Sequence, residues 1–326
     1  MSGSVLLSSP PKSKLRCLAA RRYPEVVIRV AVSDNGEDTG WEYELSFTQD
    51  NRQRPTLKSE IVRKSGRTIL QRPTSEDTKD PDRLSQTHIE QVNVNREFRE
   101  LAEFFQTVRY LHLVPQLVRE PDRYLARIAD PFGSDFLEQV ARTPERTRDA
   151  RLRKIGEALK GAVPQLLDLQ FFRDEIKGAP HFRGQYEHWR PQGAWQTEEQ
   201  FSDGTLRLLG LLWAVLDGPG PLLLEEPELS LHTDVVRFLP QIFAAMQRRT
   251  GRQVLMSSHS ADLLRDEGIG LDEVLLLKPH AEGTHVEVAT NSAQVRALVV
   301  GGLQLPDAVL PETRPPKARQ FALFGE

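Results

Sequence analysis

The sequence has a single cysteine, Cys17, among its 326 residues, so an internal disulfide framework is excluded. It also lacks a long apolar run, because the longest, Leu208 to Leu216, is far shorter than the roughly 20 residues that cross a bilayer. The N-terminus has no charged-then-apolar signal pattern. We therefore expect a cytoplasmic protein without a membrane segment.

A large excess of charge is missing as well. The 43 Lys and Arg residues nearly balance the 46 Asp and Glu residues, which gives a net charge of -3. Such a chain is not drawn to nucleic acid as a whole, so any DNA contact must come from a local patch. The length allows one large core, or a core with a subdomain.

The N-terminal part, residues 1–72, is predicted to be an antiparallel β subdomain preceded by a loose leader over residues 1–20. Asp34-Asn35-Gly36 is typical of a hairpin turn between the first two strands. The predicted strands are residues 25–32, 41–47 and 56–63.

Residues 73–175 are predicted to be a linker and a helical insert. Residues 73–87 are polar and indicate a loop, whereas residues 120–170 are charged with a helical pattern. A helix is expected near 96–105 and a short strand near 108–114. The insert contains a basic run that is either a phosphate-contacting patch or a solvated helix with paired charges. Its members are Arg142, Arg146, Arg148, Arg151, Arg153 and Lys154.

Strands alternate with helices over residues 176–290, which predicts an α/β core with a mostly parallel sheet. The predicted helices are 206–216, 234–248 and a short one from Ala261, and the predicted strands are 221–224, 253–256 and 272–277. Residues 291–326 are predicted to be a C-terminal helix and a Pro-rich tail.

The first of three polar segments, Phe201-Ser202-Asp203-Gly204-Thr205, opens the apolar helix. Ser202 suits an N-cap, and Gly204 allows close approach of a ligand to the backbone. A helix N-terminus also attracts phosphate through its free N–H groups. An ordinary helix cap is the alternative interpretation.

The second and third segments each follow an apolar strand. Glu225 and Glu226 end the run Leu222-Leu223-Leu224, and adjacent carboxylates there are costly unless a cation or a donor compensates them. Mg²⁺ prefers one or two carboxylates together with water and substrate phosphates. His259 follows Val254-Leu255-Met256 and can hydrogen-bond a terminal phosphate or the carboxylate pair.

In this order and spacing, the three segments resemble the signature motif, Walker B motif and switch histidine of ABC-type ATPases. Glu225-Glu226-Pro227-Glu228 followed by Leu229-Ser230-Leu231-His232 is similar to the RecF/SMC-like subgroup with an AAA-type core. The resemblance covers about residues 195–280. It implies a P-loop NTPase-like ABC ATPase head that binds ATP and Mg²⁺.

The resemblance also implies a role for each site residue. Glu225 would lie near Mg²⁺, Glu226 would polarise the attacking water, and His259 would meet the γ-phosphate. Ser202, Asp203 and Gly204 would form the signature turn that caps the nucleotide of an opposing head. Leu229 to His232, including Ser230, would be the D-loop across that head–head dimer.

One part of this ATPase pattern is absent. The sequence contains no Gly-Lys dipeptide, so the lysine-bearing phosphate loop and its N-terminal strand are missing; Ser65-Gly66-Arg67-Thr68 is the nearest imitation. We expect that the chain begins downstream of that loop through truncation, a late start codon or a split gene. We also expect the sheet to expose an unpaired flank where the strand belongs.

Two functions are therefore open. The first is an ATP-hydrolysing head in DNA repair, genome maintenance or phage defence, working as a homodimer or with a partner head and with DNA as a further partner. The alternative is a catalytically incomplete fragment or split subunit that supplies signature and Walker B surfaces in trans. A nuclease is disfavoured, since only about 65 residues follow His259 and they contain no second acidic cluster.

The last residues, Gln320-Phe-Ala-Leu323-Phe324, resemble the bacterial sliding-clamp-binding peptide, although Phe321 stands where that peptide has Leu. The other interpretation is that Leu323 and Phe324 fold back onto the head. We predict that a labelled tail peptide binds the clamp through Gln320, Leu323 and Phe324, as measured by fluorescence anisotropy. An absence of binding at tens of micromolar would rule the clamp out.

Overall fold

The computed structural model describes residues 25–33, 40–49, 54–120, 130–189, 194–280 and 283–314. The predicted leader, the turn at Asp34-Asn35-Gly36 and the clamp-like tail with Gln320, Leu323 and Phe324 lie outside these residues. The chain divides into two compact units. The first contains the described residues up to Gln106 and Leu277–Val286, and the second contains Thr107–Leu276 and Glu287–Arg314.

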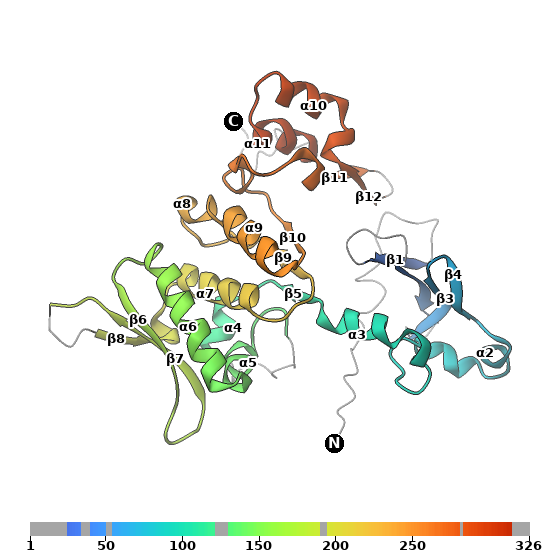
Figure 1. Ribbon diagram of the computed structural model, residues 1–326, viewed down its shortest axis with the longest axis horizontal. Coiled ribbons are helices and arrows are strands. Elements are labelled where there is room, and N and C mark those ends of the chain that lie inside the picture. The colour runs from blue at the N-terminus through green and yellow to red at the C-terminus, as the bar shows by residue number, and fades with distance from the viewer. Residues whose placement is uncertain are drawn as a thin grey trace, which may run out of the picture. The chain divides into compact units, whose positions relative to one another are not determined.

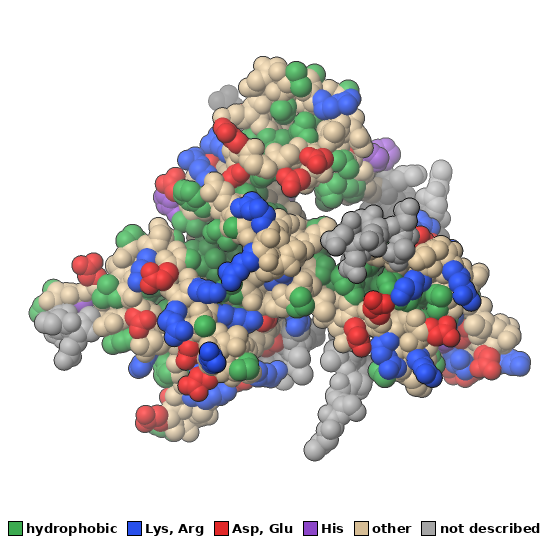
Figure 2. Space-filling model, viewed as in Figure 1, with side chains coloured by type: hydrophobic (Ala, Val, Ile, Leu, Met, Phe, Trp, Pro, Cys, Tyr) green, Lys and Arg blue, Asp and Glu red, His purple; other side chains and the backbone are tan. Residues whose placement is uncertain are grey.

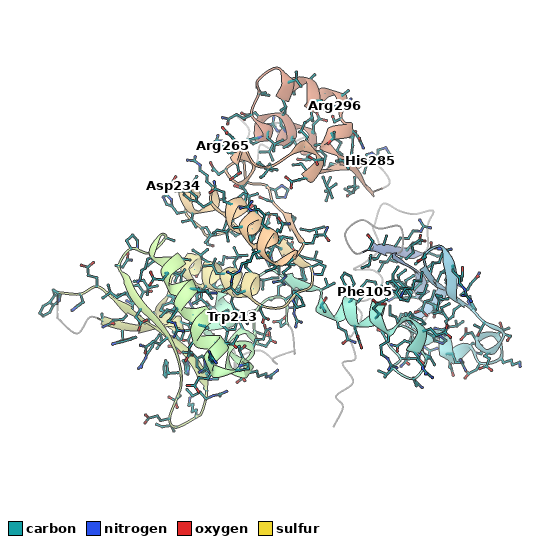
Figure 3. The ribbon with its side chains drawn as sticks, in the orientation of Figure 1. Phe105, Trp213, Asp234, Arg265, His285 and Arg296 are labelled. Atoms are coloured by element: carbon teal, nitrogen blue, oxygen red, sulfur yellow. The ribbon has the colours of Figure 1, made fainter. Side chains whose placement is uncertain are left out.

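The first unit is built on an antiparallel sheet with the order β1-β2-β3-β4, as the sequence predicts (Figure 1). Its strands are β1 (Val26–Val32), β2 (Trp41–Gln49), β3 (Pro55–Lys64) and β4 (Arg67–Arg72). Helix α3 (Arg99–Thr107) packs on the sheet, and Phe105, labelled in Figure 3, meets the Tyr43 ring edge-on at 5.6 Å.

The segment predicted as a polar loop, residues 73–87, is more ordered than expected. It contains helix α2 (Ser75–Lys79) and the 3-10 helix η1 (Pro81–Ser85), and the 3-10 helix η2 (Arg96–Phe98) precedes α3. Thr74 caps α2 by accepting a hydrogen bond from the Asp77 backbone N–H.

A buried ion network fastens this segment to the sheet. The side chains of Arg72, Glu60 and Asp77 are all 0% exposed. The guanidinium of Arg72 donates to both oxygens of Asp77 (3.1 and 2.8 Å), to Glu60 Oε2 (3.1 Å) and to two backbone carbonyls. Glu60 in turn accepts from the backbone N–H groups of His88 and Ile89. Charges this deep are tolerated because their polar atoms are satisfied.

The second unit contains a parallel sheet with the order β10-β9-β5, formed by β5 (Arg109–Leu111), β9 (Leu222–Glu225) and β10 (Val254–Ser257). The predicted parallel α/β core is confirmed, although β5 is shorter than expected. Within the described residues, β10 is an outer strand of this sheet, which agrees with the expected open flank.

Helix α7 (Asp203–Leu216) lies in the middle of the second unit's core. It is apolar on nearly every side, as expected of a buried helix, and Trp213, labelled in Figure 3, meets Phe136 edge-on at 6.4 Å. The surrounding helices are α4 (Pro115–Arg119), α5 (Phe136–Arg142), α6 (Glu145–Lys160), α8 (Thr233–Val236) and α9 (Leu239–Thr250).

The prediction of helix throughout residues 120–170 is wrong at its end. Helix α6 stops at Lys160, and an antiparallel sheet with the order β6-β7-β8 follows (Figure 1). Its strands are β6 (Leu166–Arg173), β7 (Pro180–Tyr186) and β8 (Ala194–Thr197), and the 3-10 helix η4 (Glu198–Gln200) leads from β8 toward α7. In β6, Leu167, Leu169 and Phe171 alternate with Asp168 and Gln170, a pattern typical of a strand.

Some basic side chains of the run on α5 and α6 make contacts within the second unit. Arg151 pairs with Asp217 at 2.8 Å and lies over the Trp213 ring, and Arg148 lies over the Phe171 ring. Figure 2 shows Lys and Arg side chains interspersed with acidic ones over this region. The pairing favours the solvated-helix interpretation.

The last elements are short helices and a pair of strands. The 3-10 helices Leu263–Arg265 and Leu271–Glu273 precede the strands β11 (Leu275–His280) and β12 (Gly283–Val288), and the helices α10 (Ala293–Val300) and α11 (Leu305–Val309) follow. β11 pairs with β12, which the sequence did not predict. No helix of the described residues is long and apolar enough to cross a bilayer.

We predict that Arg72→Ala lowers the free energy of unfolding by about 3–5 kcal/mol, because it leaves two buried carboxylates uncompensated. Hydrogen bonding to Arg72 also lowers the pKa of Asp77, so this stability is present above the ordinary carboxylate pKa and is lost as pH falls through the lowered value. Urea unfolding at several pH values measures both effects. The control is Arg29→Ala, which removes the exposed pair with Glu44. Equal midpoints for the two variants would contradict the prediction.

Candidate functional site

The parallel sheet brings the predicted chemical residues to one edge. Leu222–Glu225 pairs in register with Val254–Ser257, so Glu225 lies opposite Ser257. β5 pairs with the other side of β9, with Leu111 opposite Leu224. The carboxyl ends of the three strands therefore lie together, and the residues that follow them form the candidate site.

Glu225 is exposed at the end of β9 and has two neighbours, Tyr110 on β5 and His112 directly after β5. The Tyr110 hydroxyl donates a hydrogen bond to its carboxylate, and His112 Nδ1 lies 3.3 Å from its carbonyl oxygen. The hydrogen bond to Glu225 raises the pKa of Tyr110 to about 12. The phenol thus remains a donor near neutral pH and orients the carboxylate.

Glu226 and His259 come together, as predicted. The Glu226 backbone N–H donates to the Ser257 carbonyl (2.9 Å), and its φ of 43° is in the left-handed region that non-glycine residues rarely adopt. His259 Nε2 lies 4.0 Å from Glu226 Oε1. The imidazole is 87% exposed and the Glu226 side chain 33%, so both can reach a ligand at the sheet edge.

Glu228 contributes a feature that the motif did not predict. Its Oε1 accepts a hydrogen bond from the Ser258 hydroxyl, which ties the loop after β9 to the loop after β10. Its Oε2 is buried and has no hydrogen-bond partner. A buried carboxylate oxygen without a partner is costly, so this atom suits a donor or cation supplied from outside the described residues.

The predicted signature turn begins α7. Ser202 is the N-cap, and its hydroxyl accepts from the Thr205 backbone N–H (3.1 Å). Asp203 pairs with Arg119 (2.6 Å), whose guanidinium also donates to the Phe201 carbonyl (2.7 Å). The Ser202 and Asp203 side chains are thus engaged within the chain, whereas the first-turn N–H groups give this end of the helix a partial positive charge.

The signature turn and the predicted D-loop touch within one chain. A Cβ on Gly204 would lie 2.6 Å from the Ser230 carbonyl oxygen, so only glycine fits there. Ser230 itself has a φ of 62°. His232 ends the loop by capping α8, accepting from the Asp234 N–H (3.2 Å).

Arg207, on the second turn of α7, was missed by the sequence argument. Its Nε is buried without a hydrogen-bond partner, and burial lowers its pKa while Asp203 and Glu226 raise it. The Arg207 guanidinium on α7 therefore interacts electrostatically with the Glu226 carboxylate after β9. A cation inside the apolar run from Leu206 to Leu216 was the signal that could have revealed it.

The residues present fit Mg²⁺ only in combination with a nucleotide. In the part of the chain that the structure describes, no group of three or more His, Cys, Asp or Glu could hold a metal ion. Glu225 and Glu226 do supply the one or two carboxylates that Mg²⁺ combines with water and phosphate oxygens. The fit for ATP is partial, because the sequence has no Gly-Lys phosphate loop.

A parallel sheet with acidic and histidine residues after adjacent strands, beside a capped glycine-containing helix start, defines the class of an ABC-type ATPase head. Residues 13–266 match the family described as AAA domain, putative AbiEii toxin, Type IV TA system. The chain belongs to this family. The match confirms the AAA-type core that the sequence resemblance implies.

Solved structures similar to the chain include three SMC heads. The Smc head bound to the C-winged helix domain of ScpA is 12% identical, covers 81% of this chain and 74% of its own, and has a TM-score of 0.41. The SMC head domain from Thermotoga maritima is 10% identical, covers 82% of this chain and 74% of its own, and has a TM-score of 0.38. The Smc head bound to the C-terminal domain of ScpA derived from Pyrococcus furiosus is 8% identical, covers 86% of this chain and 80% of its own, and has a TM-score of 0.41. No curated protein matches the sequence.

We predict that Gly204→Ala lowers the unfolding free energy by about 1–3 kcal/mol, because the added methyl group collides with the Ser230 carbonyl. The matched control is Gly156→Ala on α6, where the new Cβ would meet only Leu169 Cβ at 3.6 Å. That control should unfold at the same temperature or higher, since alanine favours helix. Equal melting temperatures for the two variants would contradict the close approach.

Proposed function

We propose that the chain supplies the Walker B, switch and signature surfaces of a composite ATPase site that hydrolyses ATP at an interface between two heads. The observation that carries this proposal is the position of Glu226, whose backbone is fixed to β10 through Ser257 and whose carboxylate lies 4.0 Å from His259. A carboxylate beside an imidazole, at the open end of a parallel sheet, suits activation of water.

Each residue then has one role. Glu226 accepts a proton from the attacking water, and His259 donates a hydrogen bond to the terminal phosphate. Glu225, oriented by Tyr110, would hold Mg²⁺, which would neutralise charge on the phosphates. Ser202, Asp203, Gly204 and Ser230 contact the nucleotide of the opposing head, with the N–H groups of the first turn of α7 as donors.

The partner in this proposal is a second copy or another head that meets the chain through ATP. DNA is a further partner, and DNA repair, genome maintenance or phage defence in the cytoplasm is the setting. Gln320, Leu323 and Phe324 remain the proposed contact with a sliding clamp.

A second candidate function is a catalytically incomplete fragment or split subunit that acts only in trans. The specific observation in its favour is the absence of Gly-Lys from the sequence. Without the phosphate loop there is no nest of amide groups for the α/β-phosphates and no lysine on the β/γ-phosphates.

We predict that the pure chain binds ATP weakly and releases phosphate no faster than its Glu226→Gln variant. A coupled phosphate assay and fluorescent ATP titration measure these two quantities. Glu267→Gln, which changes an exposed carboxylate outside the site, is the matched control. Turnover that Glu226→Gln abolishes and Glu267→Gln preserves would refute the incomplete fragment and favour a complete head.

The composite-site proposal has its own test. The chain mixed with a partner that carries a Gly-Lys loop should hydrolyse ATP. Glu226→Gln should then slow turnover by about 10²- to 10⁴-fold, the usual contribution of a general base. Hydrolysis that survives this substitution would exclude Glu226 as the base.

A further inference from the structure

The β6-β7-β8 sheet has one covered face and one outward face. Helix α6 packs on the covered face, where Leu166, Leu169 and Phe182 join the core of the second unit (Figure 1). Because side chains alternate along a strand, the register identifies the residues on the other face. They are Asp168, Gln170, Phe172, His181, Arg183, Gln185, Trp195 and Thr197.

The composition of this outward face is unusual for a solvated sheet surface. It has no aliphatic side chain, and its centre is a row of rings and one guanidinium. Trp195 is 43% exposed, and Arg183 is exposed beside it.

The rings and the guanidinium form a layered stack. His181 stacks on Phe172 with ring centroids 5.4 Å apart and planes 28° apart. The Arg183 guanidinium lies 5.4 Å from the Phe172 centroid and 4.8 Å from the Trp195 centroid. A hydrogen bond from Arg183 Nε to Gln170 Oε1 (3.0 Å) orients the guanidinium between these two rings.

The carboxylates near this stack are already engaged. Glu198 lies beneath it at 1% exposure, where it meets His181 Nδ1 (2.6 Å) and accepts from the Phe182 N–H (2.8 Å). Asp168, at the end of the face, accepts from Gln170 Nε2 (2.6 Å). The centre of the face thus presents the Arg183 guanidinium and aromatic rings, while Asp168 lies at its end and Glu198 is buried.

We propose that this face, which we call the stacking face (Phe172, His181, Arg183 and Trp195), binds single-stranded nucleic acid. Unpaired bases stack on aromatic rings and on guanidinium planes, and a sheet surface spaces such groups for successive bases. Arg183 contacts the backbone phosphate between stacked bases. A duplex keeps its bases inside the helix, so this face discriminates against it.

The stacking face is connected to the start of α7. Glu198, which holds His181, belongs to η4, and Phe201 at the end of η4 packs edge-on against Tyr186 of β7 at 6.2 Å. Ser202 follows directly. A strand bound on the stacking face would therefore act on the segment that positions the signature turn. The binding itself does not depend on the proposed ATPase function.

The test is fluorescence anisotropy of the full chain, without nucleotide, against labelled dT20, rU20 and a 20-base-pair duplex. We expect saturable binding of dT20 or rU20 and at least fivefold weaker binding of the duplex. Trp195→Ala and Phe172→Ala should each weaken single-strand binding by about fivefold or more, since one stacked base contributes about 1–3 kcal/mol. Arg183→Lys keeps the positive charge but removes the planar guanidinium on which a base can stack, so it should also weaken binding.

Two controls separate loss of stacking from loss of fold. Trp195→Phe keeps a ring and should restore most of the affinity, and Ile176→Ala changes a 94% exposed residue between β6 and β7 and should bind as the wild type does. Circular dichroism melting checks that each variant folds. No binding of either single strand, equal binding of the duplex, or unchanged affinity in folded Trp195→Ala would overturn the proposal.

Discussion

The pairing of β9 with β10 is the constraint on which the candidate site depends. One register places Glu225 opposite Ser257, and the next hydrogen bond, from Glu226 N to Ser257 O, places the second carboxylate beside His259. A slip of β9 by one residue against β10 would turn its buried face outward and separate these side chains. Leu222 and Leu224, which are buried, resist that slip because it would move them out of the core. Packing of the buried leucines therefore fixes the register that brings Glu226 and His259 together.

The sequence predicted those residues whose position follows from a strand end. Polar residues after an apolar run mark the carboxyl end of a buried strand, and parallel strands bring such ends together, so Glu225, Glu226 and His259 could be grouped without coordinates. Tyr110 could not be added, because its contact with Glu225 depends on β5 joining β9 across 115 residues of sequence. The pairing of Gly204 with Ser230 is long-range in the same sense.

Two errors have a different physical origin. The prediction of helix up to residue 170 extends the pattern of the true helix α6 past its end, into a short alternating segment that is typical of a strand. Residues 73–87 are predicted to be a loop because they are polar and charged, yet Arg72 buries Glu60 and Asp77 with it. Composition describes the average environment of a segment, whereas a guanidinium with five satisfied donors can hold a charged segment inside.

Buried polar groups with hydrogen-bond partners differ in role from buried polar groups without them in this chain. Arg72 is buried with acceptors for its donors, which makes it a structural fastener. Four side-chain polar atoms of the described residues are buried without partners. Arg207 Nε and Glu228 Oε2 belong to the elements around Glu226, whereas Arg252 Nη2 and Thr290 Oγ1 lie elsewhere. Buried polar atoms without partners cost stability, so a ligand that offers an acceptor to Arg207 and a cation to the carboxylates would offset part of that cost at the Glu226 edge. This edge, rather than the buried network of the first unit, is therefore the candidate for chemistry.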